Sequence, residues 1–155
     1  MKSPKRPVLA LSVTATLALG VASWAVSDPT GTDAIKARQE TMEGIGDAMG
    51  GLAAIAKGEA PFDAAVVSKN AGTIAGHLEQ AAALFPAGSD TGDVETWAKA
   101  DIWSDRDMFE ETLDAAQKAA TAMQSVTEEA AFRPALGKLG QQCKACHEMF
   151  RRPKD

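Results

Sequence analysis

The residues best equipped for chemistry lie together near the C-terminus, where the sequence reads Cys143-Lys144-Ala145-Cys146-His147. This C-x-x-C-H spacing is typical of an attachment site for c-type haem. On a helix, residues three and four apart share one face, so the two thiols can add to the two vinyl groups of one porphyrin. The imidazole of His147 lies on the same face and can bind the iron as the proximal axial ligand. The motif predicts one covalent haem c.

Three other uses of these residues compete with haem attachment. A disulfide between cysteines three apart closes a loop that is too short to constrain the chain. A thioredoxin-like dithiol requires a preceding strand in a βαβ unit, which the sequence does not offer. A zinc site needs about four ligands, and the only other histidine is the distant His77. Haem attachment is therefore the favoured interpretation.

Residues 1–25 have the layout of a secretory signal peptide. Three basic residues precede an uncharged, mostly apolar stretch, and Ser23 and Ala25 suit the −3 and −1 positions of a cleavage site. The stretch 8–26 is also just long enough to span a bilayer, so an uncleaved membrane anchor is the alternative. Either interpretation places the predicted domain, residues 28–155, in the periplasm, and haem c attachment follows export in bacteria.

The composition excludes several classes of protein. The chain has 155 residues, of which 45% are hydrophobic and 24% charged, as in one ordinary globular domain. Aromatic residues make up only 5%, which disfavours a β-sandwich or barrel. The formal charge of −5 gives no reason to expect a nucleic-acid binder, whose domain should carry a basic face.

Gly and Pro clusters divide the rest of the chain into four predicted helices, at about 33–57, 63–85, 104–126 and from between 127 and 134 to 152. Apolar residues recur in each at helical spacing, with Val66 and Met108 among those predicted to face inward. Thr32 or Asp33 is the predicted N-cap of the first helix. The segment 86–101 is rich in turn formers and predicts a long loop. Together these features predict an all-α antiparallel four-helix bundle.

Two kinds of helix breaker need an explanation within this scheme. Pro134 is best tolerated in the first turn of the fourth helix, where its missing N–H has no partner to lose. Six glycines inside helices each cost up to about 1 kcal/mol relative to alanine. A bulky, flat group pressed against the first and fourth helices would explain them, because glycine allows close approach to the backbone. These glycines are Gly44, Gly46, Gly50, Gly51, Gly137 and Gly140.

Four further segments resemble one protein family. They are Arg38-Gln39-Glu40-Thr41-Met42, AIAKGEAPFDAA from Ala54 to Ala65, IWSD from Ile102 to Asp105, and KACHEMFRR ending at Arg152. With the haem motif close to the C-terminus, they are similar to the class II cytochromes c, which comprise cytochromes c prime and low-spin cytochromes c-556. The resemblance implies a left-handed four-helix bundle whose haem is bound to the fourth helix and packs against the first.

The family resemblance also bears on the second axial ligand. Four residues after the arginine of the first helix, cytochromes c prime commonly carry an apolar residue that leaves the iron five-coordinate and open to nitric oxide and carbon monoxide. The low-spin branch carries a methionine that binds the iron, and here this residue is Met42. Bis-His ligation through His77 is an alternative, although a partly exposed helical histidine needs no such role. Met149 lies on the proximal side and is unsuitable.

Other residues are predicted to surround the haem. By resemblance, Arg38 contacts a haem propionate. Met49 lies two turns beyond the predicted methionine ligand on the same face and is either a weaker candidate for that ligand or a residue that packs against the haem. Trp103 is also predicted to pack against the haem. Arg151 follows the axial histidine by one turn, where it either tunes the iron or interacts with the helix C-terminus.

The charge is unevenly distributed. Without residues 1–25 the formal charge becomes −8, yet residues 133–155 hold six Lys or Arg against two acidic residues. This basic patch is predicted to surround the haem edge and to dock on an acidic face of a redox partner. The predicted function is therefore a periplasmic electron carrier, not an enzyme, with a gas-binding cytochrome c prime as the alternative. The resemblance also implies a homodimer through the first two helices. The patch consists of Lys138, Lys144, Arg151, Arg152 and Lys154.

Overall fold

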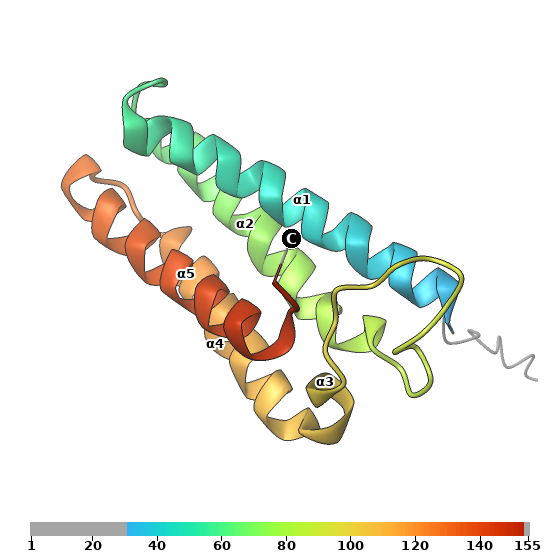
Figure 1. The fold of residues 1–155 in the computed structure, drawn as a ribbon. Helices are drawn as coiled ribbons and strands as arrows, with labels where there is room; N and C mark the ends of the chain where they lie inside the picture. Colours follow the sequence, from blue (N-terminus) through green and yellow to red (C-terminus); the bar gives the residue numbers. More distant parts are fainter. Residues whose placement is uncertain (1–30, 154–155) are drawn as a thin grey trace, which may run out of the picture.

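A computed structural model of the chain describes residues 31–153, so the predicted signal peptide lies outside the described residues. Four long helices form an antiparallel bundle (Figure 1): α1 (Thr32–Lys57), α2 (Ala64–Ala81), α4 (Arg106–Met123) and α5 (Glu129–Phe150). A 3-10 turn, η1 (Ala82–Leu84), extends α2, and the short helix α3 (Asp101–Ser104) precedes α4. The predicted all-α four-helix bundle is confirmed. Within residues 31–153 no helix is long and apolar enough to cross a membrane.

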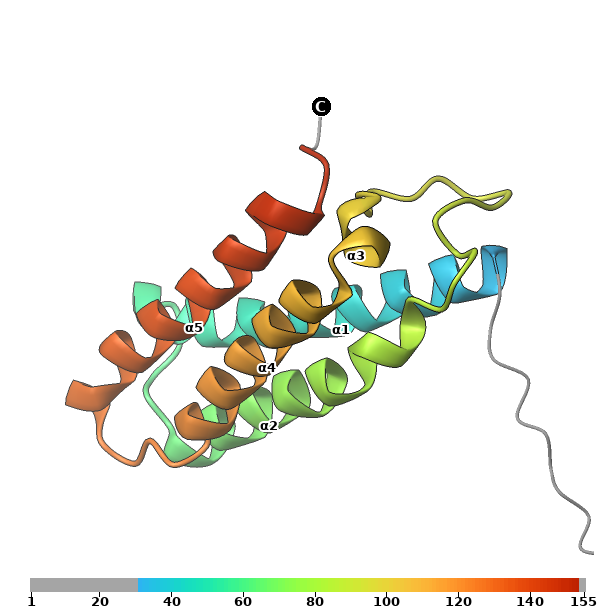
Figure 2. The same ribbon diagram turned by 90° about the horizontal axis from the view of Figure 1, so that it is seen from below.

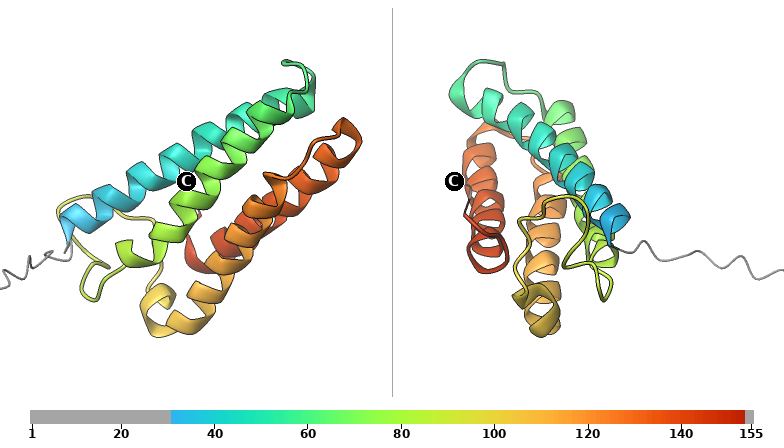
Figure 3. Two further views of the ribbon diagram at one scale, coloured as in Figure 1. Left: turned by 180° about the vertical axis from the view of Figure 1, so that it is seen from behind. Right: turned by 45° about the vertical axis from the view of Figure 1, so that its right-hand side comes forward.

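The bundle consists of two helical hairpins that share one contact. Helix α1 packs on α2, α4 packs on α5, and α2 packs on α4, whereas α1 and α5 are not among the closely packed pairs. Figure 3 shows the two hairpins diverging from the α2–α4 contact. The largest buried side chains come from all four long helices, and they include Leu52, Ile74, Met123, Phe132 and Leu139. This arrangement leaves the side between α1 and α5 for a site.

Residues 86–100 form an irregular segment, which we call the strap. It leaves the end of η1, passes the N-terminal end of α1 and reaches the C-terminal end of α5 before α3 begins (Figure 2). The predicted long loop is confirmed, although its last residue, Asp101, already belongs to α3. The strap is the element that spans the open side of the bundle.

The N-terminus of α1 differs from the prediction in a way that involves the strap. Gly31 is the N-cap, with no side-chain cap, so neither Thr32 nor Asp33 has that role. The hydroxyl of Thr32 instead accepts a hydrogen bond of 2.8 Å from the backbone N–H of Asp93. A side chain that could have capped its own helix therefore binds the strap.

Helix α5 ends two residues earlier than predicted, and more residues of the helix precede Pro134 than predicted. Pro153 disfavours a helical conformation for Arg152, and the chain after Phe150 is extended, with Arg151 pairing in a β-bridge with Ala98. Because α5 begins at Glu129, Pro134 lies in the second helical turn and not in the first. Its ring therefore removes a hydrogen bond that the helix would otherwise make.

Two predictions about which side chains face inward are wrong. Val66 and Met108 are each 43% exposed, while the adjacent Val67 and Phe109 are buried. Both exposed residues lie in the first turn of a helix, where one residue of displacement moves a side chain by about 100° around the axis. A short apolar run at a helix end does not determine which of its members is buried.

The glycines divide into two groups. A Cβ on Gly44 would lie 2.7 Å from Nε2 of His77, and one on Gly51 would lie 3.3 Å from the Asn70 amide, so these two allow close approach of α2 and not of a haem. For the other four, a Cβ would meet nothing within 4 Å. These are Gly46, Gly50, Gly137 and Gly140. Only this second group leaves space along α1 and α5 beside the bundle.

Replacing Pro134 by alanine should stabilise the protein. The substitution restores an N–H to the second turn of α5 and removes a steric clash, which stabilises the folded state by up to about 3 kcal/mol. Without the proline the unfolded chain has more conformational freedom, which lowers this gain by about 0.4–1 kcal/mol. We expect the free energy of unfolding to rise by about 1–2 kcal/mol in urea titration. Arg133→Ala, at the exposed neighbour, is the control. A loss of stability in Pro134→Ala would contradict this account of the helix start.

Candidate functional site

The C-terminal half of α5 carries the motif residues on adjoining helical positions. Cys143, Cys146 and His147 are half-buried, and both thiols are free of disulfides. The helix is continuous from Glu129 to Phe150, so the spacing of three and four residues places these side chains on one face. The predicted local geometry of the attachment motif is therefore present.

A pocket of about 320 Å³ lies where this face of α5 meets α1 and the strap. Helix α1 contributes Arg38, Gln39 and Met42, and the strap contributes Thr96, Trp97 and Ala98. The remaining lining residues are mostly apolar side chains from the core, together with the end of α5: Phe85, Ile102, Phe109, Leu113, Cys146, His147, Phe150 and Arg151. A predicted thioether and a predicted imidazole from two different helices thus line one pocket.

Not all predicted site residues lie in this lining. Cys143 and Met49 are half-buried and pack against the hydrophobic core beside the pocket. His77 contacts α1 at Gly44, on the α1–α2 contact, and does not line the pocket. Met149 is 40% exposed. Among the methionines and histidines considered as axial ligands, Met42 and His147 are the two that the fold brings together.

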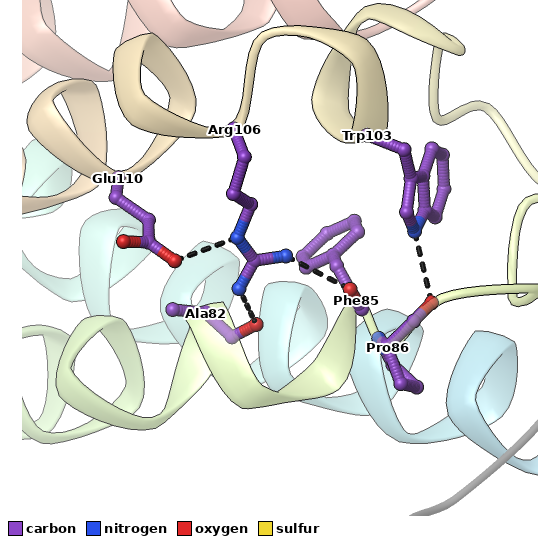
Figure 4. A network of polar contacts seen from close by, with 6 residues as sticks. All are labelled: Ala82, Phe85, Pro86, Trp103, Arg106 and Glu110. Atoms are coloured by element: carbon purple, nitrogen blue, oxygen red, sulfur yellow. Dashed lines mark hydrogen bonds and ion pairs between the residues drawn. The ribbon is translucent and has the colours of Figure 1, made fainter.

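Trp103 is also absent from the lining, and its position has a different explanation (Figure 4). The indole N–H donates a hydrogen bond of 2.9 Å to the carbonyl of Pro86, the first residue of the strap. Arg106 donates to the carbonyls of Phe85 and Ala82, at 2.8 and 2.7 Å, and pairs with Glu110 at 2.6 Å. These contacts join α3 and α4 to the point where the chain leaves η1 for the strap.

Arg38 is the most deeply buried charged residue of the site, with 4% of its surface exposed. Its Nη2 donates to the carbonyl of Ser89 and to the hydroxyl of Thr96, both at 2.8 Å, and its Nη1 donates to the hydroxyl of Ser89 at 3.2 Å. Burial lowers the pKa of Arg38, and the nearby Asp90 partly opposes this shift. A guanidinium has five N–H donors, so Arg38 retains two for an anionic group in the pocket.

The electrostatics of α5 favour the neutral forms of the motif residues. Burial lowers the pKa of His147, and the positive charge of Arg151 lowers it further. Burial also raises the pKa of Cys143, and burial followed by the proximity of Cys143 raises the pKa of Cys146 to about 11. Both effects on His147 favour the unprotonated imidazole, whose lone pair can bind a metal.

These groups fit a haem c. Two thiols suit its vinyl groups, an unprotonated imidazole and a soft thioether suit its iron, and the apolar lining suits the macrocycle. Several lining residues carry no functional signal in the sequence, among them Phe85 and Thr96. Only a tryptophan within an otherwise polar, turn-rich segment could have hinted that the strap closes a site.

Comparisons with known proteins identify the family to which the chain is similar. The family model described as Cytochrome C' matches residues 33–151. A cytochrome c' from Rhodopseudomonas palustris is 40% identical over 79% of this chain and 84% of its own, and a cytochrome c-556 from Agrobacterium fabrum is 37% identical over 77% and 82%. The structure of cytochrome c' from Rhodopseudomonas palustris has a TM-score of 0.76 at 39% identity, covering 80% of this chain and 99% of that one.

Fold and site together define a four-helix protein that binds one haem c covalently. The chain belongs to the cytochrome c' family, the class II cytochromes c that its sequence resembles. The solved structures that it resembles include one with a bound gas. This nitric oxide complex of a mutant of cytochrome c prime from Alcaligenes xylosoxidans has a TM-score of 0.68 at 31% identity, and the match covers 78% of this chain and 95% of that one. The family function is electron transfer or gas binding.

The raised pKa values of the two thiols lead to a prediction for the folded chain before haem is attached. Because the pKa of Cys146 lies about two units above the ordinary 9.0, the thiolate fraction at pH 7.5 falls about a hundredfold, and the greater nucleophilicity of the remaining thiolate recovers about tenfold. We expect iodoacetamide to alkylate Cys146 about tenfold more slowly in the folded chain than in urea, with the rate rising towards pH 11. Equal rates in chain shown to be helical by circular dichroism would contradict the burial.

Proposed function

We propose that this protein is a periplasmic carrier of single electrons whose haem iron is bound by His147 and Met42. The observation that carries the proposal is that these two side chains, from α5 and α1, line the same pocket. A haem with two protein ligands cycles between its ferric and ferrous states with little rearrangement, and His/Met ligation raises its reduction potential. No substrate is turned over by the protein itself.

In this proposal the residues of α5 hold the cofactor and those of α1 complete its coordination. Cys143 and Cys146 would hold the haem through two thioether bonds, and the imidazole of His147 would bind the iron. Met42 supplies a neutral, soft sulfur from the facing helix. Arg38 directs its remaining N–H donors to a propionate, and Arg151 supports the proximal side beside His147. Met49 and Trp103 pack beside the lining residues and not among them, so in this proposal they reach the haem only at its periphery.

A second candidate is a five-coordinate protein that binds or scavenges nitric oxide or carbon monoxide. The nitric oxide complex of the Alcaligenes xylosoxidans relative supports this candidate. The two candidates differ in one bond: a sulfur on the iron closes the position that a gas would occupy. The substitution of Met42 therefore separates them.

Met42→Leu should convert the haem from low spin to high spin. Leucine keeps the apolar volume but removes the sulfur, so the sixth position opens and the reduction potential falls. We expect the sharp bands of the reduced visible spectrum to broaden, and carbon monoxide to bind at concentrations that leave the wild-type protein unliganded. Met49→Leu makes the same change two turns along α1, at a residue proposed to pack near the haem without binding the iron, and should leave the spin state unchanged. A wild-type spectrum that is already high-spin, and unchanged in Met42→Leu, would favour the gas-binding function.

The basic patch supports docking to an acidic partner. Lys99 from the strap joins Lys144, Arg151 and Arg152 around a shallow hollow beside His147, in a protein that is otherwise acidic. Lys99 extends the patch that the sequence predicts. Although Lys99 is distant from the patch along the chain, its side chain donates a hydrogen bond of 2.9 Å to the carbonyl of Glu148. The positive charges of this rim attract an anionic partner surface. The negative charges elsewhere on the protein oppose this attraction only weakly, because salt screens interactions beyond about 10 Å.

Electron transfer to an anionic reagent should reveal this local charge. We expect oxidation of the reduced protein by ferricyanide to slow as salt is added, although the net charge alone predicts the opposite trend. Lys144→Glu should lower the rate a few-fold at low salt. Lys118→Glu is the matched control, since the two lysines are 74% and 75% exposed and each pairs with an acidic residue one turn away. Equal effects of the two substitutions would exclude a docking role for the patch.

Two further features complete the proposal. The layout of residues 1–25 supports export, with cleavage after Ala25 or retention as a membrane anchor. We also propose that two copies associate through α1 and α2, as the family resemblance implies. Neither feature alters how the site works within one chain.

A further inference from the structure

The two helices that carry the proposed axial ligands are not held together by direct packing. Helix α1 packs on α2 and α5 packs on α4, and α1 and α5 are not among the closely packed pairs. The strap, however, is hydrogen-bonded to both. It therefore contacts both the helix that carries Met42 and the end of the helix that carries His147.

On one side the strap is bound to the first turns of α1. Arg38 donates to Ser89 and Thr96, the side-chain amide of Gln39 donates to the carbonyl of Glu95 at 2.8 Å, and Thr32 accepts from the N–H of Asp93. The strap lies so close to α1 that a Cβ on Gly92 would be 2.9 Å from the backbone nitrogen of Thr32. These contacts attach the strap one turn before Met42.

On the other side the strap is bound to the end of α5. The N–H of Lys99 donates to the carbonyl of Phe150 at 2.9 Å, and the N–H of Arg152 donates to the carbonyl of Trp97 at 2.7 Å. The guanidinium of Arg152 donates to the carbonyl of Thr96. These contacts attach the strap just beyond His147.

Thr96 is the residue at which the two sets of contacts meet. Its hydroxyl accepts from Arg38 of α1, and its own carbonyl accepts from Arg152, which follows α5. The hydroxyl also accepts from the N–H of Ala98 at 3.3 Å, which orients the backbone that pairs with Arg151. A single residue thus links the helix of the proposed sulfur ligand to the helix of the proposed imidazole ligand.

We propose that Thr96 is a positioning residue that holds α1 and α5 at the separation at which the Met42 sulfur reaches the iron. The proposal rests on the function proposed above, in which Met42 and His147 are the axial ligands. Loss of the Thr96 hydroxyl leaves a buried donor of Arg38 without its acceptor, so Arg38 and the strap must shift relative to each other. The end of α1 is then free to move away from α5, and the bond from Met42 weakens without any change in a ligand.

The test uses three substitutions within the strap of the haem-loaded protein. Thr96→Val removes the hydroxyl and keeps the shape, Thr96→Ser restores the hydroxyl, and Thr91→Val makes the same chemical change at an exposed strap residue that makes none of the hydrogen bonds above. We expect Thr96→Val to shift the spin equilibrium towards high spin by about tenfold, since a hydrogen bond to a charged group is lost. Hydrogen exchange at the amides of Lys99 and Arg152 should accelerate by a similar factor. Thr96→Ser and Thr91→Val should resemble the wild type.

The outcomes distinguish this inference from the proposed function. A Thr96→Val protein with wild-type spin state and wild-type exchange would overturn the positioning role while leaving Met42 as a ligand. Faster exchange with an unchanged spin state would also overturn it, because the strap would then stabilise the fold only. A wild-type protein that is high-spin and unaffected by Met42→Leu would overturn the proposed ligation and, with it, the positioning role.

Discussion

The guanidinium of Arg38 carries a positive charge into an apolar corner of the bundle, 5.0 Å from the ring centroid of Phe85 and 5.6 Å from that of Trp103. Its hydrogen-bond acceptors, on Ser89 and Thr96, are neutral oxygens of the strap. Burying a charge is costly unless it is hydrogen-bonded, so moving the strap oxygens away from Arg38 would carry a large free-energy cost. The ring faces add a smaller cation–π contribution. This one buried cation therefore keeps a wall of the haem pocket in place.

The same pocket requires that α1 and α5 stay apart. Most of the core lies between α2 and its neighbours, and the contact between α2 and α4 holds the two hairpins together. The pocket that fits the cofactor lies on the other side, where the face of α5 that carries His147 meets α1 and the strap. The three contacts α1–α2, α2–α4 and α4–α5 bury the core without a close α1–α5 contact. A helix bundle of this kind can therefore accept a large flat cofactor between its first and last long helices.

Helix α5 serves both the chemistry and the closure of the site. Its regular turns align Cys143, Cys146 and His147, and burial favours the unprotonated form of the imidazole. Its end, released from helical geometry before Pro153, turns back to pair with the strap. The basic side chains of that end then lie beside the pocket, on a protein whose remaining surface is acidic. Attachment, closure and the proposed docking surface thus share the last turns of one helix.

Local signals were sufficient to predict the four helices and the haem motif, which depend on spacings of three or four residues, and the long loop, which is rich in turn formers. The partners of Arg38 were not predictable in this way, since Ser89 and Thr96 lie 51 and 58 residues further along the chain. The same reason applies to Trp103, which binds the strap and does not line the pocket, and to Gly44, which faces His77. Sequence determined which residues share a helix face; only tertiary packing decided what each face meets, because contacts between distant segments leave no regular spacing.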